Sequence, residues 1–126
     1  MEKQAIVTDK APAALGPYSA GVVSGNAIHV SGQLGLVPET GAFAGDDIQS
    51  QTRQSLTNIR SILEAAGASM ADVAEVTVLL ADIADFNAMN EVYAEFFEAP
   101  YPARAAFQAA ALPKGGLVEI KVVAYL

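Results

Sequence analysis

The feature of this sequence that most constrains the fold is the shortage of helix relative to strand. Of its 126 residues, only two stretches have helical periodicity, whereas five or six short segments have the composition of strands. Two helices can cover one face of a sheet of that size, but they cannot cover both. The sequence therefore predicts a single α+β domain over residues 1–126, with a five- to six-stranded mixed sheet and both helices on one of its faces.

The clearer helix is expected to begin at Asp46 and Asp47 and to end at Ala66, just before Gly67. Aspartate favours the positive end of the helix dipole, and glycine is common just beyond a helix C-terminus. The residues of the inner face recur every three or four positions, as a buried helix face requires. They are Ile48, Thr52, Leu56, Ile59, Leu63 and Ala66. The water-facing residues are predicted to be Gln49, Gln51, Arg53, Asn58 and Arg60.

The second helix is expected from about Asp85 to Phe97, because prolines at 100 and 102 cannot continue it. Strands are expected in five segments, at residues 20–23, 27–30, 73–80, 104–109 and 117–125. In the last of these, residues 118, 120, 122 and 124 are all apolar and form one face. The opposite face of that strand carries Glu119 and Lys121, so it is predicted to be partly polar.

The mean hydropathy of +0.32 is high for so small a domain. No apolar run is long enough to cross a bilayer, so no membrane is expected as a partner. The sheet face without a helix would carry Val and Leu side chains with nothing from the same chain above them. We therefore expect the excess apolar surface to lie in a subunit interface formed through that face.

Composition also excludes several classes of function. The chain has no cysteine and one histidine, His29, so it can hold neither a disulfide, nor a thiolate zinc site, nor a pair of imidazole ligands. It lacks the glycine patterns of phosphate-binding loops and the elbow motif of serine hydrolases. A formal charge of −7 disfavours binding to nucleic acids and anionic membranes. The first residues carry no signal-peptide pattern, so a cytoplasmic location is expected.

Arg104 is the first candidate for chemistry, because it is the only charge in an apolar segment. A guanidinium in such surroundings needs a partner, which can be an acidic side chain in a structural ion pair or the carboxylate of a ligand. Glu119 is the second candidate. It can form an exposed pair with Lys121 or with a charge on a neighbouring strand, or it can act as a general base on water. The residues alone leave both alternatives open for each candidate.

Two further segments lie where a ligand could reach them. Ser31, Gly32 and Gln33 are expected to end the strand that precedes them, and a glycine there permits close approach of a ligand or of another backbone. Tyr18 follows a Gly-Pro pair and can either pack against the domain or line a pocket.

The remaining polar candidates are Asn90, His29 and two aspartates. Asn90 lies mid-helix beside apolar residues, so its amide needs a hydrogen-bond partner or a ligand. His29 is interpreted as a structural histidine rather than a base. Asp82 and Asp85 are interpreted as capping residues near the start of the second helix.

Five short motifs, taken together, resemble the RidA family, also called YjgF. They are Gly16-Pro17-Tyr18-Ser19, Ser31-Gly32-Gln33, Asn90-x-x-Tyr93-x-x-Phe96-Phe97, Pro102-Ala103-Arg104 and Val118-Glu119-Ile120. Each motif is weak alone, but their order and spacing are specific and cover essentially the whole chain. The resemblance implies a chorismate-mutase-like α+β fold that assembles as a homotrimer. In that assembly the sheets would pack into a central barrel, with three clefts between the subunits.

The resemblance also implies an activity, the hydrolysis of reactive enamines and imines to 2-keto acids and ammonia. The substrates would be 2-aminoacrylate, its imine 2-iminopropanoate, and 2-iminobutanoate, which arise as by-products of pyridoxal-phosphate enzymes. The role would therefore be detoxification. No cofactor and no metal are expected, because a protonated imine already attracts water. The partner would be a small imino or keto acid in an intersubunit cleft, with no nucleic acid and no membrane involved.

Residue by residue, the resemblance assigns Arg104 to the substrate carboxylate and Glu119 to the water that attacks the imine carbon. Tyr18 of the partner subunit would form a wall of the cleft. The remaining lining would consist of Ser31, Gly32, Asn90 and the backbone at Ala106.

Two departures from the family pattern matter. Many relatives have Cys or Thr where this chain has Ala106, and the smaller side chain would enlarge the pocket if the backbone makes the contact. Gln108 stands where the family often has Glu, and it is interpreted as structural. The alternative function is a non-catalytic protein of the same fold that binds a small carboxylate in a regulatory or chaperone-like role. The intact pair of Arg104 and Glu119 favours the deaminase.

Overall fold

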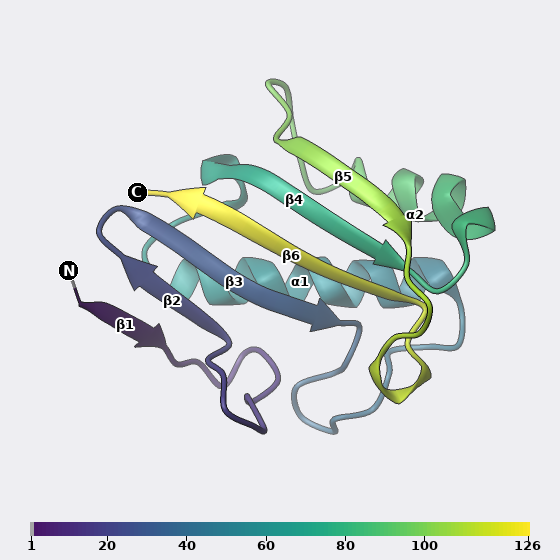
Figure 1. Ribbon diagram of the computed structural model, residues 1–126, viewed down its shortest axis with the longest axis horizontal. Helices are drawn as coiled ribbons and strands as arrows, with labels where there is room; N and C mark the ends of the chain where they lie inside the picture. The colour runs from purple at the N-terminus through teal and green to yellow at the C-terminus, as the bar shows by residue number, and fades with distance from the viewer. Residues whose placement is uncertain (1) are drawn as a thin grey trace.

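The computed structural model describes residues 2–126 as a six-stranded sheet with two α-helices (Figure 1). In chain order the elements are β1 (Lys3–Ile6), β2 (Gly21–Ser24), β3 (Ala27–Leu34), α1 (Ile48–Ala65), β4 (Val73–Leu80), α2 (Phe86–Tyr93), β5 (Ala103–Gln108) and β6 (Val118–Tyr125). The strands lie in the order β1-β2-β3-β6-β4-β5. All neighbours are antiparallel except β4 and β5, so the sheet is mixed. The predicted α+β class is confirmed.

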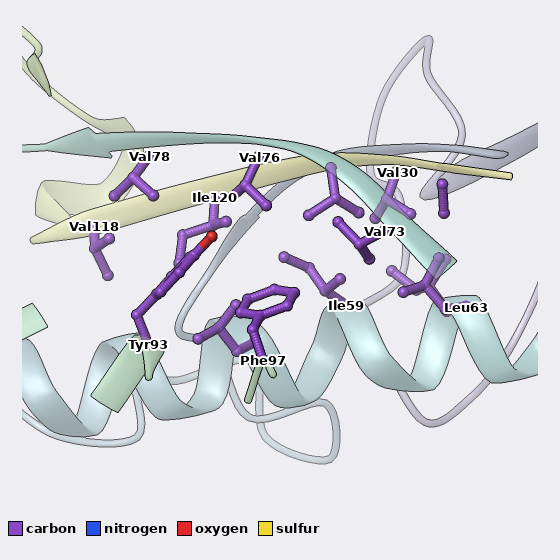
Figure 2. Close-up of a cluster of buried hydrophobic side chains, with 14 of the residues drawn as sticks. Val30, Ile59, Leu63, Val73, Val76, Val78, Tyr93, Phe97, Val118 and Ile120 are labelled. Carbon is purple, nitrogen blue, oxygen red and sulfur yellow. The ribbon is translucent and has the colours of Figure 1, made fainter. Parts of the chain in front are cut away.

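Both helices lie on the same side of the sheet, as the shortage of helix predicts (Figure 1). α1 packs across the central strands β3 and β6, and α2 packs against α1. Buried apolar side chains fill the space between the helices and the strands (Figure 2). The alternation expected in β6 is confirmed, because its apolar positions are buried on the helix side whereas Lys121 is exposed.

The ends of α1 are capped as the sequence predicts. Asp47 precedes the first helical residue, and its carboxylate accepts a hydrogen bond from the N–H of Ser50 at 2.7 Å. Gly67 follows the helix with φ of +82°, a left-handed conformation that glycine adopts without strain. The predicted inner face is buried from Ile48 to Leu63, so this helix supplies one wall of the core.

Two residues that were assigned to the water-facing side of this helix are buried. Gln51 and Asn58 are only 3 % and 0 % exposed. Gln51 donates to the carbonyl of Gly45 and accepts from the N–H of Leu117, and Asn58 donates to the carbonyl of Leu36. The prediction was wrong because a side-chain amide can be buried wherever loop backbone supplies its partners.

Two strands differ from their predicted extents. β1 was not predicted, since three of its four residues are exposed and its sequence has no apolar alternation. β3 does not end before Ser31 but continues to Leu34. The pairing of β3 with β6 shifts register between Val30 and Gln33, so the bulge accommodates Gly32 without ending the strand.

The second helix is shorter than predicted. α2 ends at Tyr93, although the prediction extended it to about Phe97. The N–H groups of Glu95 and Phe96 bond to carbonyls three residues back, so the chain continues as tight turns rather than as an α-helix. Phe97 is nevertheless buried, which explains why the apolar stripe extends beyond the helix.

The face of the sheet opposite the helices carries no element of residues 2–126, and we call it the open face (Figure 1). The strand registers place on it alternate residues of the sheet. They include Val22, His29, Glu75, Thr77, Leu79, Ala105, Phe107, Glu119, Lys121, Val123 and Tyr125. Its large apolar side chains Phe107 and Tyr125 are 49 % and 48 % exposed. A subunit interface through this face stays a prediction. Within residues 2–126, neither helix combines the length and the apolar character that crossing a bilayer requires.

Candidate active site

Arg104 projects from the edge strand β5 towards the helix side of the sheet, because it pairs with Val76, a core residue of β4. Its Nη1 donates a 2.7 Å hydrogen bond to Oδ1 of Asn90. The ion pair found within residues 2–126 joins Arg53 to Glu95, and no carboxylate there pairs with Arg104. The structural ion pair considered for Arg104 is therefore absent from the described chain, and its charge is available to a ligand.

One face of α2 holds the guanidinium in place. Phe86, Asn90 and Tyr93 are spaced by four and three residues, so they lie on the same side of the helix. The Cζ atom of Arg104 is 5.3 Å from the ring centroid of Phe86 and 4.6 Å from that of Tyr93. Stacking on aromatic faces orients a guanidinium as well as attracting it. We call Phe86, Asn90 and Tyr93 the arginine cradle.

The residues that follow Arg104 on β5 have structural contacts. Ala106 lies on the same side of the strand and is partly buried against the core. Gln108 accepts a hydrogen bond from the N–H of Ile83 at 2.9 Å, which ties the end of β5 to the turn before α2. The structural interpretation of Gln108 is consistent with this contact. Asp82 caps that turn by accepting from the N–H of Ala84, as expected.

Glu119 lies on the open face, where its strand β6 pairs with β3 and β4. Gly32 lies directly beside it, since a methyl group on Gly32 would be 2.7 Å from Oε2 of Glu119. Glu119 is half-buried, and burial raises the pKa of its carboxyl. Among residues 2–126 it forms no ion pair with Lys121 or with a charge on a neighbouring strand, so the exposed pair considered for it is absent. Within the described residues the carboxylate of Glu119 is therefore not held in an ion pair, although Lys121 lines the cavity beside Gly32.

The bulge of β3 links this carboxylate to the segment around Tyr18. Ser31 donates from Oγ to the carbonyl of Ser19 at 2.6 Å, and its N–H bonds to the carbonyl of Ala20. Tyr18 itself is 55 % exposed. A cavity of about 350 Å³ opens beside the bulge. Its lining includes Ser19, Val22, His29, Ser31, Gly32 and Lys121. His29 is exposed there and not enclosed as a structural histidine would be.

The structure does not bring the two candidate catalytic residues together in one chain. Arg104 projects to the helix side, whereas Glu119 projects to the open face, and β4 separates their strands. A single chain therefore carries two half-sites. The arginine half-site consists of Arg104, the arginine cradle and Ala106. The glutamate half-site consists of Tyr18, Ser31, Gly32 and Glu119. That both act on one substrate stays a prediction.

The sequence did not reveal the roles of Phe86 and Tyr93. Both were assigned to the apolar stripe of the second helix, where aromatic residues usually pack into a core. The available signal was their spacing around Asn90, which places all three on the helix face that meets the lone arginine.

Fold and half-sites together define a small α+β protein with an arginine prepared for an anionic ligand. The sequence model of the family described as Endoribonuclease L-PSP matches residues 8–126. The chain belongs to this family, which includes the RidA and YjgF proteins, so the predicted family is confirmed.

Individual relatives cover nearly the whole chain. The 2-iminobutanoate/2-iminopropanoate deaminase of the goat, Capra hircus, is 51 % identical over 122 residues, which are 97 % of this chain and 89 % of the relative. The crystal structure of RidA from the Antarctic bacterium Psychrobacter sp. PAMC 21119 matches with a TM-score of 0.94 at 50 % identity, over 98 % of this chain and 99 % of that one. The crystal structure of E. coli TdcF with bound serine matches with a TM-score of 0.93 at 42 % identity, over 98 % of both chains.

Proposed function

We propose that this protein is an imine deaminase that hydrolyses 2-iminobutanoate and 2-iminopropanoate, together with the enamine 2-aminoacrylate, to 2-keto acids and ammonia. The observation that carries the proposal is the guanidinium of Arg104. It is bonded to Asn90, stacked on two aromatic rings, and paired with no carboxylate of residues 2–126. The deaminases among its relatives support this assignment.

Arg104 would bind the carboxylate that all these substrates share. A guanidinium is planar and always charged, and it presents parallel N–H groups that match the two oxygens of a carboxylate. Because Asn90 already fixes Nη1, the rest of the fork is oriented before a ligand arrives. Preorganised binding of this kind places the imine carbon at a defined distance from the rest of the site.

Glu119 would act on water. It would accept a proton as the water oxygen bonds to the carbon of the protonated imine, and it would return that proton to the amine nitrogen. The carbon–nitrogen bond then breaks as the new hydroxyl becomes the carbonyl oxygen, and the hydroxyl proton passes through Glu119 to the released ammonia. The electrons of that bond leave with ammonia, so the step needs no oxidant and no cofactor. Because burial raises its pKa, the ionised Glu119 is a better base than an exposed glutamate would be.

The two half-sites would meet between copies of the chain in a homotrimer. Arg104 and Glu119 project from opposite faces of one sheet, so one chain cannot direct both at one ligand. The exposed rings of Phe107 and Tyr125 on the open face offer apolar surface that a partner copy would bury. The ligand would then bind in an intersubunit cleft walled by Tyr18 of the partner subunit. A cytoplasmic location remains part of this proposal.

Nucleic acid has no part in the proposed function, although the family description names an endoribonuclease. A polyanion is bound mainly by clustered Lys and Arg. This chain has seven such residues against fourteen acidic ones.

The first experiment adds the purified protein to a threonine dehydratase reaction and follows the release of 2-ketobutyrate from 2-iminobutanoate. Faster release is expected, and Arg104→Ala should abolish the acceleration while the oligomeric mass is retained. Saturable binding of 2-ketobutyrate without any acceleration would instead support the second candidate, a carboxylate-binding protein. That candidate deserves a direct test because the arginine half-site is complete in one chain.

The shared site is tested by mixing two inactive variants. Arg104→Ala and Glu119→Gln are unfolded together, refolded and assayed. If each site takes Arg104 from one copy and Glu119 from another, random assembly leaves about one quarter of the sites intact, and activity returns. If both residues serve the same site from one chain, the mixture stays inactive and the shared site is wrong.

A further inference from the structure

Tyr93 contains a buried polar group that the fold itself does not explain. The residue is only 6 % exposed, yet its hydroxyl has no hydrogen-bond partner among residues 2–126. Figure 2 shows the ring rising from α2 with its oxygen directed at the strands near Ile120. Phenylalanine would fill the same space without burying an unpaired hydroxyl, which is destabilising. The hydroxyl therefore indicates that this side chain has a role in addition to packing in the core.

We attribute this additional role to Arg104, which stacks on the Tyr93 ring. Its Cζ lies 4.6 Å from the centroid of the Tyr93 ring, so the guanidinium lies over the ring and not in line with the hydroxyl. Burial raises the pKa of the Tyr93 phenol, whereas the charge and the hydrogen-bonding reach of Arg104 act to lower it. Arg104 therefore acts on the hydroxyl through its charge and its N–H groups, although no hydrogen bond joins the two in this structure.

The number of N–H donors on arginine gives the hydroxyl a role. Nη1 of Arg104 donates to Asn90, and a carboxylate in the fork takes two more N–H groups. Two of the five N–H groups of the guanidinium then remain. In a cleft closed to water, each of them needs a hydrogen-bond acceptor. Within the arginine cradle, Phe86 offers only its ring. Apart from Asn90, the acceptor in the cradle is the hydroxyl of Tyr93.

We propose that Tyr93 is a positioning residue for Arg104: its ring sets the plane of the guanidinium, and its hydroxyl accepts an N–H group once a carboxylate occupies the fork. The inference rests on the proposed function, because it takes a carboxylate as the ligand of Arg104, but it does not require that the ligand be hydrolysed. Tyr93 touches no reacting atom in this arrangement and acts only through Arg104.

The decisive variant is Tyr93→Phe, which keeps the ring and removes the hydroxyl. The dissociation constant for 2-ketobutyrate, measured by NMR titration, should rise about fivefold, as expected for one lost hydrogen bond. The Tm should stay the same or rise, because an unpaired buried hydroxyl is gone. A purely structural residue would not weaken binding while sparing stability. Wild-type affinity in Tyr93→Phe would overturn the role of the hydroxyl.

The role of the ring is tested by Tyr93→Leu, with Ile59→Val as the matched control. Ile59 is fully buried on α1, and Arg104 stacks on Tyr93 and Phe86, not on this residue. Tyr93→Leu should weaken 2-ketobutyrate binding about tenfold and lower the Tm, since cation–π stacking is lost. Ile59→Val should lower the Tm alone. Unchanged affinity in Tyr93→Leu would overturn the positioning by the ring.

The kinetic readout separates this inference from the proposed activity. In the imine assay, Tyr93→Phe should raise KM about fivefold and leave kcat nearly unchanged, because it weakens ground-state and transition-state binding alike. If the wild-type protein binds 2-ketobutyrate but does not accelerate imine hydrolysis, the deaminase proposal fails while the binding test of Tyr93 still decides this inference.

Discussion

The two half-sites are built by opposite means. The arginine half-site is defined by contacts, because Arg104 is bonded to Asn90 at 2.7 Å and stacked on Tyr93. The glutamate half-site is defined by space, because the missing side chain of Gly32 leaves room for the carboxylate of Glu119. The contacts of the arginine half-site all lie within one chain, whereas the glutamate half-site is open, and we expect another surface to close it. Substitutions in the two should therefore have different kinetic effects.

The largest effect is expected for Glu119→Gln. This change keeps the shape of the side chain but removes the base, so kcat should fall about a thousandfold while KM changes little. The Tm near neutral pH should not fall, because burial disfavours the ionised carboxylate that the amide replaces. Steady-state kinetics and thermal unfolding of the same sample give both values. A higher KM with an unchanged kcat would contradict this division of roles between the two half-sites.

Arg104→Lys should have the next largest effect, about a hundredfold in kcat/KM. Lysine keeps the charge but loses the planar fork and the stacking on Tyr93, so most of the loss should appear in KM. The imine assay with varied substrate concentration measures this split. Near-wild-type KM would show that charge alone suffices and that the arginine cradle has no role in binding.

Gly32→Ala tests the half-site made of space. The added methyl group would lie 2.7 Å from Oε2 of Glu119, so the carboxylate must shift. A shift of that kind should lower kcat about tenfold and leave the affinity for 2-ketobutyrate at Arg104 unchanged. Steady-state kinetics measures kcat, and NMR titration measures the affinity for 2-ketobutyrate. Equal losses in both would mean that the two half-sites are not independent.

The smallest effect concerns pH. The pKa of Glu119 is raised above 4.5, the ordinary value for a glutamate, so the acid limb of kcat/KM should lie above that value. The contribution of Glu119 to folding stability changes with pH in the opposite direction to that of a salt-bridged carboxylate. The protonated form is favoured in the folded state, so this residue adds stability as pH falls through its raised pKa. Comparing the pH dependence of Tm in wild-type protein and Glu119→Gln isolates that contribution.

Much of the fold was predictable because periodicity reports which side of an element is buried. β4 has its predicted bounds, the inner face of α1 is buried, and β6 alternates as expected. The errors occurred where backbone partners decide the outcome. Gln51 and Asn58 are polar but buried, because they bond to loop backbone that no periodicity reveals.

The site was predictable in its residues but not in its geometry. Arg104 and Glu119 could be singled out as charges in apolar strands, yet their separation onto opposite faces depends on strand order and register. The arginine cradle was missed because an aromatic residue on a helix looks the same from sequence whether it packs against apolar groups or under a guanidinium.

The central position of β6 has a consequence for how the protein is made. β6 lies between β3 and β4, although it follows every other strand along the chain. During synthesis, α1, β3 and β4 leave the ribosome before β6 does. The apolar face of α1 and the edges of β3 and β4 that pair with β6 therefore stay uncovered until then. The two halves of the sheet can join only after residues 118–125 emerge, so we expect slow closure and a period in which the nascent protein depends on chaperones.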